Sequence, residues 1–183
     1  MNFDEAQQDM RHAYLGGGPG LLASGAVWLA AGAAGSLVSK PASVGILVLG
    51  GMMIHPAAIG LSKLFGRPGR HARGNPLARL ALESTFLMFI GLFVAFAVMQ
   101  VKPAFFFPVM LATIGGRYLV FATLYGTRLY WGIGGALAVA GMLCLVLNAP
   151  FTTGAYLGGA IELVAALMIL SNPAFAGKSV QAE

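Results

Sequence analysis

The chain has 183 residues, of which 58% are apolar and only 9% are charged, and its mean hydropathy is +0.80. Water-soluble domains carry about 25% charged residues, so this composition excludes a soluble globular protein. The formal net charge of +5 does not indicate nucleic-acid binding, because most of the cations flank apolar segments and do not form one basic surface.

The apolar segments predict transmembrane helices. Backbone groups inside a bilayer must bond within the protein, which leaves helices or a closed barrel. Barrel strands would alternate polar and apolar residues, and these segments do not. Six of them are long enough to cross a hydrocarbon core of roughly 30 Å. We therefore expect an all-α integral membrane protein, with six transmembrane helices in one bundle and a single domain over residues 1–183.

The first 18 residues precede the bundle. Residues 2–14 predict a short amphipathic helix, and Asn2 and Glu5 have the spacing of a capping box. We expect an interfacial helix on the membrane surface, followed by a glycine hinge. Its acidic side chains are unusual for a lipid-binding helix, so a docking or gating role stays open.

The predicted bundle occupies residues 20–171. A basic loop separates its second and third spans, and a polar tail over residues 172–183 follows the last one. The spans are predicted at residues 20–38, 43–62, 80–101, 104–126, 129–148 and 153–171.

Lysine and arginine are concentrated on one side of these spans. That side carries Arg11, Lys63, Arg67, Arg70, Arg73, Arg79, Arg128 and Lys178. The opposite side carries Lys40 and Lys102. Because positively charged loops stay in the cytoplasm, we expect both termini to be cytoplasmic.

Short segments in the first three spans resemble segments in the last three spans. This similarity predicts two three-helix halves of opposite orientation, as in inverted-repeat transporters. Apolar helices align by chance easily, so a chance origin stays open. If the repeat is real, Glu83 and Glu162 are symmetry mates. The similar pairs are residues 19–24 with 108–113, 50–53 with 140–143, and 81–83 with 160–162.

Four ionisable side chains inside the spans are the candidate ligand-binding or proton-coupling residues: His55, Glu83, Arg117 and Glu162. A charge at the bilayer centre costs about 2.5–3.5 kcal/mol on insertion scales, so we expect them to face the interior and pair. Glu162 is the best placed for a special role, because small residues at i, i+4 spacing share its helical face and permit close helix approach.

Structural alternatives stay open for each of these residues. Arg117 either bridges to a glutamate, snorkels to the interface or holds an anionic ligand. Glu83 has Arg79 one turn earlier as a partner. His55 precedes Pro56, which disrupts helical hydrogen bonding, so His55 is either a hydrogen-bonded structural residue or a proton- or ligand-handling one.

No catalytic, metal or cofactor motif stands out. The sequence contains no Walker motif, metalloprotease motif or Cys-x-x-Cys pair, and we predict neither a metal nor a cofactor. An intramembrane enzyme is the least favoured function, because no nucleophile and base can be paired from their spacing.

Residues 9–20 with Trp28, and Met-Ile-His-Pro at 53–56, carry a family resemblance. They resemble a group of small bacterial membrane proteins known only as a domain of unknown function. The resemblance covers nearly the whole chain and implies six helices and a bacterial inner-membrane location. It supplies no catalytic residues.

These observations favour a small transporter, channel or ligand-binding protein for a polar or anionic solute. His55, Arg117 and Glu162 would line a site between helices, and Glu83 would lie on a cytoplasmic approach. The alternative is an accessory or scaffold protein that binds another membrane protein or itself. Membrane lipid is the expected surrounding in both cases.

Overall fold

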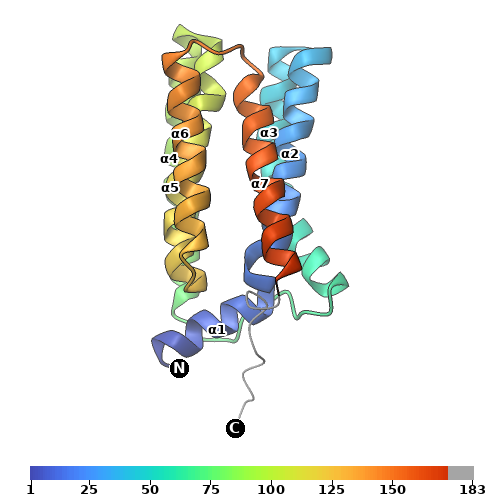
Figure 1. The fold of residues 1–183 in the computed structure, drawn as a ribbon, viewed down its shortest axis with the longest axis vertical. Coiled ribbons are helices and arrows are strands. Elements are labelled where there is room, and N and C mark those ends of the chain that lie inside the picture. Colours follow the sequence, from blue (N-terminus) through green and yellow to red (C-terminus); the bar gives the residue numbers. More distant parts are fainter. Residues whose placement is uncertain (173–183) are drawn as a thin grey trace.

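The computed structural model describes residues 1–172, and every regular element in that part of the chain is helical. Six long helices stand side by side (Figure 1). Each of them is long and apolar enough to cross a membrane. They are α2 (Gly18–Leu37), α3 (Lys40–Leu64), α4 (Leu77–Val101), α5 (Phe106–Tyr125), α6 (Leu129–Val146) and α7 (Thr153–Ser171).

The predicted all-α, six-span architecture is therefore confirmed, and each predicted span overlaps one helix with bounds that differ by a few residues. Two short 3-10 helices, η1 (Leu15–Gly17) and η2 (Pro103–Phe105), precede α2 and α5. The predicted polar tail beyond residue 172, with Lys178, lies outside the described residues.

The six helices form two groups of three. Figure 1 shows α4, α5 and α6 on one side and α2, α3 and α7 on the other. The most extensive packing is of α2 on α3 and α7, and of α5 on α6 and α4. The predicted halves correspond to α2, α3 and α4 and to α5, α6 and α7. The third helix of each half packs on the first helix of the other, α4 on α5 and α7 on α2. An inverted repeat would give this layout, and the repeat stays a prediction.

Glycines bring the paired helices into close contact. A Cβ atom added to Gly115 of α5 would lie 2.6 Å from the carbonyl oxygen of Gly134 of α6, so the two backbones touch there. Between α2 and α7, a Cβ atom on Gly25 would lie 3.1 Å from the carbonyl oxygen of Gly159. Packing through small residues is the usual way in which membrane helices associate, because lipid supplies no hydrophobic force between them.

The helix α1 (Phe3–Tyr14) lies across one end of the bundle (Figure 1). The predicted capping box is present, because the Glu5 amide donates to Asn2 and the Asn2 amide donates to Glu5. Its apolar stripe is buried by protein, with Ala6, Met10 and Ala13 each at most 1% exposed. This packing favours the docking role over a helix that rests on lipid.

Two polar side chains attach α1 to the end of α5. The Gln7 amide donates to the Thr123 carbonyl at 2.6 Å, and the Arg11 guanidinium donates to the Tyr125 carbonyl. The last carbonyls of a helix have no partner within the helix, so these side chains satisfy groups that would otherwise be open.

The loop between α3 and α4 closes over the other side of α1. Asp9 accepts hydrogen bonds from the Ala72 amide at 2.9 Å and from the Asn75 side chain at 2.7 Å. The Gly69 amide donates to the Ala13 carbonyl at 3.1 Å. The basic loop is therefore folded against α1, and we call α1 with residues 65–76 the clasp.

Candidate functional site

Glu162 is fully buried in the middle of α7. The glycine one turn earlier, Gly158, lets two neighbouring helices approach α7, since a Cβ atom there would lie 2.8 Å from the Trp28 ring and 2.9 Å from Leu111. Trp28 belongs to α2 and Leu111 to α5. The carboxyl group is thereby enclosed by three helices, as the small-residue spacing predicts.

One oxygen of this carboxyl group is bonded and the other is not. The Tyr118 hydroxyl donates to Oε1 of Glu162 at 2.6 Å. Ser24 of α2 interacts with the same carboxyl group. Even so, Oε2 is buried and has no hydrogen-bonding partner among residues 1–172. An unsatisfied buried polar atom is costly, and Oε2 is the oxygen of this carboxyl group that bears that cost.

A cluster of aromatic rings leads from Glu162 toward the clasp. The Tyr118 and Tyr130 rings have centroids 5.8 Å apart, and Tyr130 stacks on Tyr125 at 5.4 Å. The Tyr130 hydroxyl donates to the Gly16 carbonyl in η1 at 2.7 Å. Gly17 follows with φ of 89°, and a side chain there would collide with the Tyr130 hydroxyl. The carboxyl site and the turn before α2 are thus packed together.

Arg117 lies on a different face of α5 from Tyr118 and reaches toward α4. Its guanidinium donates to the Thr85 hydroxyl at 3.1 Å and to the Met88 sulfur at 3.0 Å, and it lies 5.2 Å from the Phe121 ring centre. Its buried Nε has no partner among the described residues.

No salt bridge joins Arg117 to a carboxylate in the described part of the chain, where the ion pairs are the N-terminus with Glu5 and Arg79 with Glu83. The predicted bridge from Arg117 to Glu83 or Glu162 is therefore not formed. A guanidinium with only neutral partners keeps an uncompensated charge, which is expensive in the membrane.

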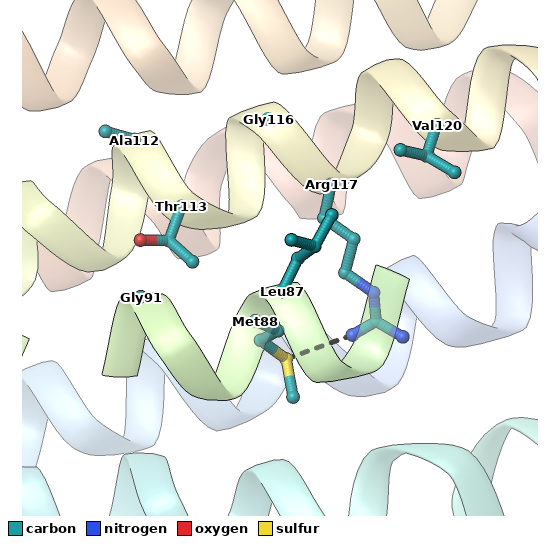
Figure 2. A pocket seen from close by; sticks show the side chains of 8 residues that line it. All are labelled: Leu87, Met88, Gly91, Ala112, Thr113, Gly116, Arg117 and Val120. Atoms are coloured by element: carbon teal, nitrogen blue, oxygen red, sulfur yellow. Dashed lines mark hydrogen bonds between the residues drawn. The ribbon is translucent and has the colours of Figure 1, made fainter. Parts of the chain in front are cut away.

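A groove of about 330 Å³ opens beside Arg117, between α4 and α5 (Figure 2). Leu87, Met88 and Gly91 of α4 line one wall, and Gly116 and Val120 are among the residues of α5 that line the other. Its volume is at the lower end of the range for small-ligand sites, about 300–1,000 Å³. Figure 2 shows the guanidinium displaced toward Val120, and so toward the end of α5 that carries the clasp.

His55 and Glu83 lie apart from this region. Glu83 is exposed and pairs with Arg79 at 3.5 Å, the structural alternative given by the sequence. His55 is exposed on α3, which continues as a helix through Pro56. The structure thus places Arg117 and Glu162 on either side of α5 and leaves the other two candidates on outer surfaces.

Sequence reasoning missed Tyr118, Tyr130 and Ser24 as parts of the polar site. A signal was present for the first of them. Tyr118, Phe121 and Tyr125 are spaced three and four residues apart, which puts three aromatic rings on one helical face next to a buried charge. No local pattern shows that Tyr130 and Ser24 join them from other helices.

Comparison with known proteins assigns the chain to a family. A family model described as "Family of unknown function (DUF7010)" matches residues 3–172. The chain belongs to this family. No curated protein and no solved structure matches it. The description of DUF7010 gives no activity.

Proposed function

We propose that the protein binds a small anionic solute inside the membrane and transports it. Arg117 would contact the anion, and Glu162 would exchange a proton with it or with water. The observation that supports this most directly is the guanidinium of Arg117, which has no carboxylate partner among residues 1–172 and faces a groove. A bound anion would neutralise that charge through charge-assisted hydrogen bonds.

The adjacency of Arg117 and Tyr118 on α5 supports coupling between the proposed anion site and Glu162 of α7. Arg117 and Tyr118 are consecutive residues of α5, and Tyr118 holds the Glu162 carboxyl group. A shift or rotation of α5 on anion binding would therefore move the hydrogen-bonded phenol as well. Conformational change of this kind needs packed elements with two arrangements, which six helices in two groups can supply.

Binding is tested by melting curves of the purified protein with inorganic phosphate, acetate, oleate and phosphatidic acid as probes. We expect at least one probe to stabilise the wild type, by about 2.7 kcal/mol at a hundredfold excess over Kd. Arg117→Ala should lose this effect. Arg73→Ala, at an exposed loop arginine, is the control and should keep it. Stabilisation of the Arg117→Ala variant by the same probe would contradict the proposal.

The proposed orientation places the clasp in the cytoplasm of a bacterial cell. Arg67, Arg70 and Arg73 lie in the clasp, and Lys40 and Lys102 lie at the other end of the helices. The end of α7 is at the clasp end of the bundle in Figure 1. This charge distribution supports cytoplasmic ends, because cationic segments are retained inside.

Trypsin tests the orientation and the clasp together. In vesicles with the cytoplasmic face outward, we expect slow cleavage after Arg70 and Arg73, and about tenfold faster cleavage in Asp9→Ala, because two hydrogen bonds to the loop are lost. Asp4→Ala, at an exposed acid of the same helix, should cleave like the wild type. Cleavage only in vesicles of the opposite orientation would reverse the proposed topology.

A scaffold role is the second candidate, and the outer face of α3 favours it. His55, Met52 and Met53 are all exposed there, and a histidine facing lipid without a partner is costly. A second membrane protein or another copy of the chain would cover these side chains. Site-specific cross-linking from position 53 in native membranes separates the candidates, since a transporter working alone gives no protein adduct.

A further inference from the structure

We infer that the groove between α4 and α5 is a lateral site for an acidic phospholipid, whose phosphate binds Arg117 while an acyl chain lies along α5. This site rests on the anion-binding role of Arg117 in the proposed function, and it specifies that anion as a lipid phosphate that comes from the bilayer and not from water.

The walls of the groove indicate entry from the membrane. Leu87 is 60% exposed, and Phe86 and Ile90 beside it on α4 are exposed as well. On α5, Ala112 and Gly116 of the lining are exposed. In a membrane helix these exposed apolar faces meet hydrocarbon. A ligand that reaches the groove through them must itself be apolar over part of its length.

The α5 wall provides a smooth track for a chain. Gly116 has open space where a side chain would stand. Ala112 lies one turn before it and Val120 one turn after it, and Thr113, whose hydroxyl donates to the Val109 carbonyl, is the other residue of this wall besides Arg117 (Figure 2). A stripe of small residues does not by itself indicate a ligand, but this one lies beside the Arg117 guanidinium.

The hydrogen bonds of Arg117 leave room for a phosphate. Its NH1 donates to the Met88 sulfur, a weak acceptor, and its Nε has no partner in the described residues. Phosphate oxygens accept from two guanidinium nitrogens at once, which makes arginine well suited to this headgroup. A phosphate would replace the sulfur contact with a charge-assisted one.

The depth of Arg117 fits a headgroup at the clasp end of the bundle. It lies eight residues before Tyr125, the last residue of α5, which corresponds to about 12 Å along the helix. The side chain extends toward that end, as in snorkelling arginines (Figure 2). A phosphate drawn slightly inward from the headgroup layer would meet it.

Native mass spectrometry with lipid titration tests this site. We expect phosphatidic acid to bind the wild type about tenfold more tightly than phosphatidylcholine, and this preference to disappear in Arg117→Gln. Gly116→Leu should also remove it, by filling the track. Gly132→Leu is the matched control, because Gly132 of α6 has the same open space and lies outside the groove.

Each other outcome overturns the lipid site. If inorganic phosphate binds in an Arg117-dependent way and Gly116→Leu changes nothing, the anion comes from water, and the proposed function stands without the lipid. If phosphatidic acid binds Arg117→Gln and Gly116→Leu as well as the wild type, the lipid binds elsewhere. If no anion responds to Arg117, both proposals fail.

Discussion

Gly134→Val is expected to push α5 away from α6 and to destabilise the whole bundle. A Cβ atom on Gly134 would lie 2.5 Å from the carbonyl oxygen of Gly115, a backbone atom that cannot rotate aside. Overpacking costs about 1–3 kcal/mol of stability where side chains can adjust. Because a backbone atom cannot, we expect Gly134→Val to cost about 3 kcal/mol or more. We expect a melting temperature roughly 6–12 °C lower in detergent, at 2–4 °C per kcal/mol for a chain of this size.

The adjacent glycine provides the control for this change. Gly135 has nothing within 4 Å of the place where a Cβ atom would stand, so Gly135→Val should melt close to the wild type. Both variants replace glycine by the same β-branched residue in the same helix, so helix propensity cancels in the comparison. Equal melting temperatures for the two variants would show that α5 and α6 do not meet through these glycines.

Glu162→Gln is expected to keep the fold and to abolish proton movement coupled to anion flux. The glutamine carbonyl still accepts the hydrogen bond from Tyr118, but the amide cannot take up a proton. In proteoliposomes carrying a pH-sensitive dye, the pH change that accompanies uptake of an anion identified by the melting screen should fall to background. Glu83→Gln, at the exposed ion pair with Arg79, should leave it unchanged.

Two further readouts separate coupling from structure at Glu162. Tyr118→Phe removes the donor and leaves both carboxyl oxygens poorly satisfied, so it should destabilise the protein by about 1–3 kcal/mol. If Glu162→Gln melts as low as Tyr118→Phe, the carboxylate is structural. If Glu162→Gln folds and still carries protons with the anion, another group exchanges them.

The membrane class, the six helices and the ends of most of them follow from the amino-acid sequence. These properties depend on contacts within a few residues. A long apolar run must become a helix in lipid, and the Lys-Pro pairs at 40–41 and 102–103 stand where one helix ends and the next begins. The capping box at Asn2 and Glu5 is local in the same way, and the structure contains it.

Only the packing of the helices shows which ionisable groups are buried and which face outward. Arg117 and Tyr118 are neighbours in the sequence, yet one faces the groove beside α4 and the other holds Glu162 of α7. Periodicity in an all-apolar helix does not tell which face meets protein and which meets lipid, because both are equally apolar. For that reason the outward positions of His55 and Glu83, and the burial of the apolar stripe of α1 by the rest of the protein, followed only from how the helices pack.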